Sequence, residues 1–78
     1  MDAEAFKFLG MGLVAFGMLG AAIGVGIIFG NAAQGVARNP AAVGQIRGVA
    51  ILGAALAEFM GLLSFVLGIM IMVKSVAA

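Results

Sequence analysis

The sequence predicts an all-α membrane protein, in which two transmembrane helices form an antiparallel hairpin and assemble into a homo-oligomeric ring. Of its 78 residues, 65% are hydrophobic, and only four basic and three acidic residues are present. A soluble domain of this size has too much surface to leave so apolar. Two long uncharged stretches, separated by a short polar connection, give the hairpin. We expect one transmembrane domain over residues 1–78.

The first helix is predicted over about residues 8–37. Thirty uncharged residues separate Lys7 from Arg38, enough to cross a hydrocarbon core about 30 Å thick. The N-terminus is acidic before Lys7, and no polar domain follows the first apolar stretch. It therefore does not resemble a secretory signal. Met1 is expected to begin the mature chain, which favours a bacterial protein.

The second helix is predicted over about residues 42–74, after a turn at about residues 38–41. Pro40 suits the first turn of a helix, where a missing N–H costs nothing, and Asn39 is a candidate N-cap. A connection this short forces the two helices to be antiparallel neighbours.

The basic residues predict the orientation. The connection carries Arg38 and Arg47, while the N-terminal segment carries two acids and one lysine and the C-terminal segment one lysine. By the positive-inside rule the turn is cytoplasmic and both termini lie on the outer, periplasmic side. The expected location is the inner (plasma) membrane of a bacterial cell.

Glu58 is the most informative residue. It is the one charge in a run of 26 residues from Gly48 to Val73. It lies roughly 15 Å along the helix from Gly48, near the middle of the hydrocarbon core. A charge there costs about 2.5–3.5 kcal/mol or more, so such residues generally mark an ion or proton pathway. The alternatives are an inter-helix hydrogen bond from a neutral Glu, or an ion pair with a cation of another protein.

Small residues in the first helix predict close helix packing. Gly20, Ala22, Gly24 and Gly26 follow at steps of two. Two residues turn a helix by about 200°, so Gly20 and Gly24 lie on one side and Ala22 and Gly26 nearly opposite. A helix with small residues on two opposite sides can pack closely against a neighbouring helix on each side. If the same contact between subunits is repeated by rotation, the subunits form a closed ring. The alternative is that glycine is simply frequent in transmembrane helices.

The second helix carries a stripe of small residues spaced three or four apart: Ala50, Ala54, Ala57, Gly61, Ser64 and Gly68. The stripe is predicted to pack against the first helix, with bulky side chains on the remaining surface. Glu58 borders it, at a depth predicted to match Gly24 to Ile28 on the first helix.

Composition excludes several kinds of site. The chain has no Cys, His, Trp or Tyr, so disulfides and thiolate metal sites are ruled out. Arg38 and Arg47 are too few for a nucleic-acid surface. We expect no metal, no cofactor and no nucleic-acid partner.

The motifs and their spacing resemble one family. The sequence contains Arg38-Asn39-Pro40, ten intervening residues, Ile51-Leu52 and then Leu56-Ala57-Glu58, after a glycine-rich helix. This pattern resembles the c subunit (proteolipid) of F-type ATP synthase, most closely its alphaproteobacterial and mitochondrial branch, over essentially the whole chain.

The resemblance implies a non-catalytic rotor subunit. Identical hairpins would form a ring in membrane lipid, with the first helix inside, turning against the a subunit of the membrane sector. Reversible protonation of Glu58 would couple proton flow to ATP synthesis. The turn of Arg38, Asn39 and Pro40 would face the central stalk; the plainer interpretation is that Arg38 sets topology and Asn39 caps a helix.

The resemblance also bears on the coupling ion. Sodium-carrying relatives add a Gln on the first helix and a Ser or Thr just after the acid, whereas the matching positions here hold Val25, Phe59 and Met60. A hard cation needs several oxygen ligands, so H⁺ is expected.

Two alternatives stay open from the sequence. One is the proteolipid of another rotary machine such as a V-type ATPase, which usually has a longer, duplicated chain. The other is a small pore-former or a dimeric proton-coupled transporter, which would usually need more spans and aromatic residues around the carboxyl group.

Overall fold

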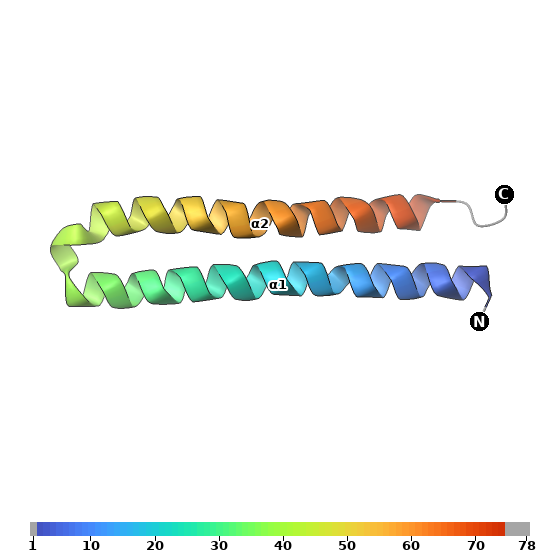
Figure 1. The fold of residues 1–78 in the computed structure, drawn as a ribbon, viewed down its shortest axis with the longest axis horizontal. Helices are drawn as coiled ribbons and strands as arrows, with labels where there is room; N and C mark the ends of the chain where they lie inside the picture. Colours follow the sequence, from blue (N-terminus) through green and yellow to red (C-terminus); the bar gives the residue numbers. More distant parts are fainter. Residues whose placement is uncertain (1, 75–78) are drawn as a thin grey trace.

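Two long helices lie side by side and antiparallel (Figure 1). The computed structural model describes residues 2–74, which form α1 (Ala3–Arg38), the 3₁₀ turn η1 (Pro40–Ala42) and α2 (Val43–Val73). Both α1 and α2 are long and apolar enough to cross a membrane. The predicted all-α hairpin is confirmed.

α1 begins five residues before the predicted position near residue 8. Asp2 is its N-cap: a side-chain oxygen accepts a hydrogen bond of 2.8 Å from the Ala5 N–H. Glu4 adds a negative charge to the first turn, where it interacts favourably with the helix dipole. The helix therefore extends through the charged N-terminal segment, beyond the apolar span that the sequence pattern marks.

The reversal of the chain depends on backbone hydrogen bonds. The Asn39 N–H donates to the Gly35 carbonyl at 3.0 Å and ends α1, and the Ala42 N–H donates to the Asn39 carbonyl at 3.0 Å. Pro40 takes the first position of η1, as predicted. Asn39 takes the N-cap position of η1, as predicted, but its side chain makes no capping hydrogen bond. The tight 3₁₀ turn satisfies these groups without it.

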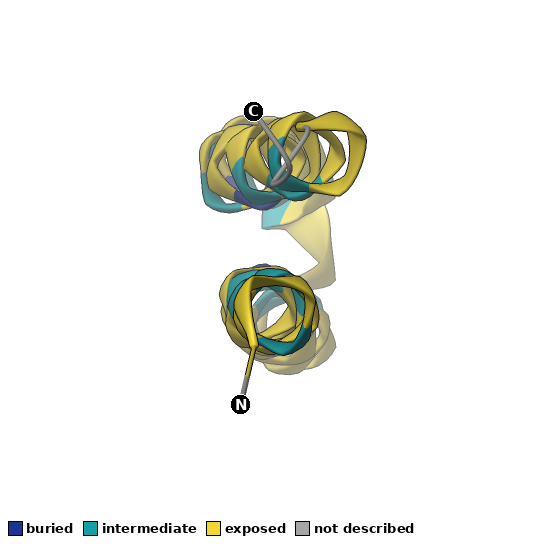
Figure 2. Ribbon diagram, turned by 90° about the vertical axis from the view of Figure 1, so that its right-hand side faces the viewer, coloured by how far each residue is buried: buried dark blue, intermediate teal, exposed yellow. Residues whose placement is uncertain are grey.

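The two helices contact each other through small residues. Figure 2 shows that the buried residues and many of the half-buried ones lie on the facing sides of the helices, while the outer sides are mostly exposed. The predicted stripe of α2 is confirmed, because all six of its members are buried or half-buried. We call this contact the small-residue seam; it joins that stripe of α2 and Gly53 to the facing residues of α1, which are Val14, Gly17, Ala21, Gly24 and Ile28.

Close contacts across the seam set the register of the hairpin. A Cβ placed on Gly24 would lie 3.5 Å from the Ala57 Cβ, and one on Gly53 would lie 3.4 Å from the Ile28 Cδ1. Glu58, next to Ala57, is therefore level with Gly24. The predicted match to Gly24 is correct, but its extension to Ile28 is wrong. Ile28 lies about one turn nearer the loop, because the chain reverses immediately after Asn39.

Ser64 is the polar member of the seam. Its hydroxyl donates to the Met60 carbonyl at 3.1 Å, which satisfies the group inside its own helix. The Oγ also occupies the space in which a side chain at Gly17 would lie. A side chain at position 17 would therefore have to displace the Ser64 hydroxyl of the neighbouring helix.

We predict that Gly17→Ala destabilises the hairpin by about 1–3 kcal/mol, the usual cost of overpacking. The measurement is thermal unfolding of the detergent-solubilised monomer by circular dichroism. Gly20→Ala is the matched control, because nothing lies within 4 Å of a Cβ at Gly20. Removing the clash in Gly17→Ala/Ser64→Gly should recover most of the loss. Equal unfolding of the two single variants would contradict this packing.

Candidate functional site

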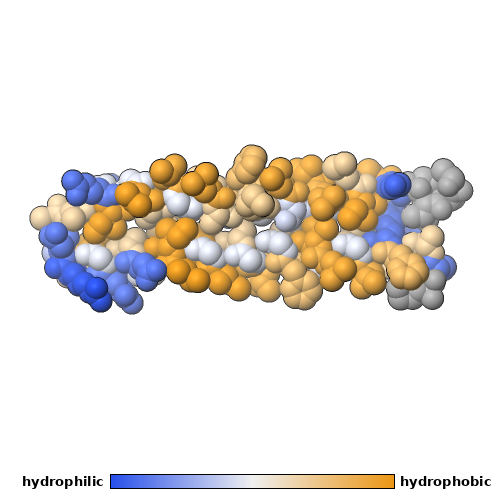
Figure 3. All heavy atoms as spheres, viewed as in Figure 1, coloured by the Kyte–Doolittle hydropathy of each residue, from blue (hydrophilic) through white to orange (hydrophobic). Residues whose placement is uncertain are grey.

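Glu58 occupies the centre of α2. Equal numbers of residues separate it from Val43 and from Val73, the two ends of the helix. Hydrophilic groups gather at the two ends of the molecule, and the middle is mostly apolar (Figure 3). The nearest basic residue along α2 is Arg47, which lies roughly 16 Å away at 1.5 Å per residue. Among residues 2–74, no basic side chain is therefore positioned to neutralise Glu58.

The Glu58 carboxyl group lies at the edge of the small-residue seam. The residue is exposed, and its Oε1 is 3.1 Å from the position of a Cβ on Gly61. Within residues 2–74 the carboxyl group has no ion pair and no hydrogen bond to a side chain. The inter-helix hydrogen bond considered from the sequence is therefore not found in the hairpin.

The surroundings of Glu58 offer little to a metal ion. Phe59 and Met60 are exposed, at 60% and 61%, and Val25 is half-buried. None of these side chains carries an oxygen. Among the residues that the structure describes, no group of three or more His, Cys, Asp or Glu comes together.

The predicted packing residues of α1 separate into two groups. Gly24 contacts α2, whereas Gly20, Ala22 and Gly26 are exposed, and nothing lies within 4 Å of a Cβ at Gly20 or Gly26. The open surface continues to Gly12 and Gly30, which also have no neighbour within 4 Å. We call the part of this surface around Gly26 the open glycine face; its members are Gly12, Ala22, Gly26 and Gly30, whereas Gly20 lies about 120° away from Gly26 around the helix. The sequence pattern did not single out Gly12, which stands apart from the main glycine cluster.

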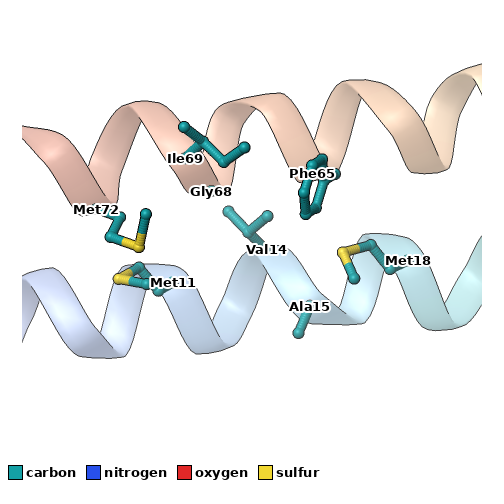
Figure 4. Close-up of a pocket in the computed structure, with 8 residues that line it drawn as sticks. All are labelled: Met11, Val14, Ala15, Met18, Phe65, Gly68, Ile69 and Met72. Atoms are coloured by element: carbon teal, nitrogen blue, oxygen red, sulfur yellow. The ribbon is translucent and has the colours of Figure 1, made fainter.

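An apolar groove runs between the helices toward the end that holds the termini (Figure 4). Figure 4 shows Val14 pointing across to the α2 backbone at Gly68, with methionines from both helices beside it. The groove is lined by Met11, Val14, Ala15, Met18, Phe65, Gly68, Ile69 and Met72. This lining suits apolar side chains or lipid chains and offers no side-chain hydrogen bond to a polar substrate.

The turn residues lie far from Glu58. Arg38, Asn39 and Pro40 are all exposed, at the end of the hairpin opposite Asp2 and Lys74. Pro40 is roughly 27 Å along the helix from Glu58, at 1.5 Å per residue. The structure therefore keeps the polar turn and the membrane carboxyl apart as separate candidate sites.

The fold and the site define a small membrane hairpin with one carboxyl group at its centre. The family model for the ATP synthase C subunit matches residues 9–71. The ATP synthase c subunit of Rickettsia bellii is 49% identical over 71 residues, covering 91% of this chain and 96% of the relative. The ATP synthase c subunit of Orientia tsutsugamushi is 47% identical over 72 residues, covering 92% and 97%.

A third relative, the ATP synthase c subunit of a Wolbachia strain from Culex pipiens, is 46% identical over 71 residues, covering 91% of this chain and 95% of its own. The chain belongs to the family of ATP synthase C subunits. The resemblance seen in the sequence is confirmed, including its alphaproteobacterial character.

We predict that a hydrophobic carbodiimide modifies Glu58 selectively over Asp2 and Glu4. The reagent partitions into lipid and reacts with protonated carboxyl groups, and Glu58 alone lies at membrane depth. Sodium ions should not slow the reaction, because Val25, Phe59 and Met60 supply no ligand oxygen. Mass spectrometry of labelled protein with and without sodium checks this. Protection by sodium would contradict the assigned surroundings.

Proposed function

We propose that Glu58 carries protons in the membrane rotor of an F-type ATP synthase. The observation that supports this most directly is the position of Glu58, a lone carboxyl group at the centre of α2 with no basic side chain of residues 2–74 nearby. The protein itself is non-catalytic: proton movement through the membrane turns the rotor, and ATP is made elsewhere in the complex.

The proton cycle follows from solvation. A carboxyl group that faces lipid stays neutral, because hydrocarbon penalises its charged form. When it faces a polar channel beside a cation, it can release its proton. An arginine of the a subunit would supply that cation, since no basic residue of this chain lies at the level of Glu58. Each proton that crosses 100 mV releases about 2.3 kcal/mol, which biases the direction of rotation.

The open glycine face supports assembly into a ring. A lone hairpin leaves this smooth surface of α1 uncovered, together with the apolar groove between the helices. Small residues let neighbouring backbones approach closely in lipid. A head-to-tail contact repeated by rotation closes a ring with α1 on the inside. In that ring α2 lies outside, and Glu58 faces lipid and the a subunit.

The turn supports a contact with the central stalk. Arg38 and Asn39 are exposed and project a charge and hydrogen-bonding groups from the end of the hairpin. The two arginines near this end favour its placement in the cytoplasm, with both termini on the periplasmic side of the inner membrane.

The coupling ion is H⁺ in this proposal. Reversible protonation needs one carboxyl group, whereas binding Na⁺ would need further oxygen ligands around it.

We predict that Glu58→Gln assembles normally and abolishes proton flow. The amide of Gln has nearly the shape of the neutral carboxylic acid, but it does not release a proton as the acid does. ATP synthesis driven by an imposed proton gradient in reconstituted vesicles is the measurement, with Glu4→Gln as the matched control. Retained synthesis in Glu58→Gln would exclude Glu58 as the carrier.

We predict that Gly26→Leu prevents ring assembly and leaves the hairpin folded. Position 26 is open in the hairpin, so the added side chain meets only a neighbouring hairpin of the ring. Gly24→Leu is the contrasting variant: it should separate the two helices of one hairpin, because Ala57 lies against it. Gel electrophoresis reports assembly and circular dichroism reports helix stability. Normal rings of Gly26→Leu would show that this face is not an interface between hairpins.

We predict that Arg38→Ala leaves an assembled ring and weakens stalk attachment. Retention of the soluble sector on purified membranes is measured beside passive proton conduction through stripped membranes. Conduction should match that of the unaltered protein, because Arg38 is remote from Glu58. Tight stalk binding combined with lost conduction would contradict this separation of roles.

A further inference from the structure

Gly61 lies close both to the facing helix α1 and to the carboxyl group of Glu58. It is buried in the small-residue seam. A Cβ placed there would lie 2.9 Å from the Ala21 Cβ on the facing helix. The same Cβ would lie 3.1 Å from Oε1 and 3.8 Å from Cδ of Glu58 on its own helix. One added methyl group would therefore press on the partner helix and on the carboxyl group together.

The other glycines along the seam differ from Gly61. A Cβ at Gly24 or Gly53 would meet only apolar side-chain atoms of the facing helix, at 3.5 Å and 3.4 Å. These are ordinary or slightly tight packing distances. Among the glycines of the described chain, Gly61 alone has carboxyl atoms within 4 Å of its Cβ position. Its missing side chain thus leaves a slot beside Glu58.

We propose that Gly61 is a positioning residue for Glu58. The slot lets the carboxyl group lie along α2, one turn toward the C-terminal end and against the seam, rather than extend into lipid. Rotation of the side chain alone then moves the carboxyl group out of the slot, with no movement of either helix. This inference rests on the proposed function, because it assigns Gly61 to the resting position of the proton carrier.

The competing explanation is that Gly61 serves helix packing alone. Exchanging the methyl group between positions 21 and 61 distinguishes a role in helix packing from a role in positioning Glu58. In Ala21→Gly/Gly61→Ala the methyl at position 61 no longer meets the Ala21 methyl, so the volume of the seam is conserved. The new methyl group still fills the slot beside the Glu58 carboxyl group.

The experiment compares this double variant with Ala21→Gly and Gly24→Ala as matched controls. Ring assembly is scored by gel and microscopy, and the initial rate of Glu58 modification by a hydrophobic carbodiimide is measured on purified rings. The double variant should assemble like the unaltered protein and react about two- to tenfold faster, the range for a side chain displaced from its preferred rotamer. Both controls should react at the unaltered rate. A double variant that reacts at or below that rate overturns the proposal.

A second measurement tests the proposal if the double variant assembles poorly by itself. It is co-expressed with the unaltered protein, and labelling is compared between the two kinds of chain in the same rings. Their α2 peptides differ in mass by one methylene group and are resolved by mass spectrometry. Faster labelling of the variant peptide supports the slot. Equal labelling, or exclusion of the variant from mixed rings, overturns it.

Labelling reports where the carboxyl group lies and does not depend on proton transport. Failure of the slot is therefore distinguishable from failure of the proposed function. If Glu58→Gln still supports proton-driven ATP synthesis, Glu58 is not the carrier, whatever the labelling rates. If Glu58→Gln is inactive and the double variant is labelled at the unaltered rate, Glu58 remains the proposed proton carrier. The proposed role of Gly61 in positioning Glu58 is then wrong.

Discussion

The structure depends on close contact between two helices that have no hydrophobic driving force to bring them together in lipid. Lipid tails are as apolar as the side chains they would replace, so association relies on van der Waals packing. Small residues on both helices allow it, and Ala21, Ala50 and Gly61 are buried where the helices meet. Because these contacts pair particular residues of the two helices, they also set the depth of Glu58 relative to α1.

The same constraint separates the two faces of α1. Gly24 is used within the hairpin, where it meets Ala57, while Gly26 is left open to the outside. A helix with small residues on one face only could form a hairpin and stop there. With small residues on both faces, the hairpin keeps an open surface on α1. Glu58 on α2 is exposed rather than enclosed. Proton exchange requires that exposure, since an enclosed carboxyl group could not reach a channel.

Much of this arrangement could be predicted from the sequence. The two spans, the short turn and the stripe of α2 follow from charge spacing and from the three-to-four spacing of small residues. Three features could not be obtained in this way. The capping of α1 by Asp2 depends on local hydrogen bonding beyond the apolar span. The turn at Asn39 is closed by backbone hydrogen bonds, and the Asn39 side chain makes no capping hydrogen bond. The contact of Gly61 with Glu58 depends on a rotamer, which periodicity does not report.

Direct imaging of the purified oligomer in a lipid nanodisc tests the central claim most directly. The expected result is a closed ring with the open glycine face of α1 on its inner wall, where successive α1 helices meet, and Glu58 on the outer α2 helices near the middle of the lipid belt. A dimer, or a ring in which Glu58 lies outside the hydrocarbon layer, would contradict it.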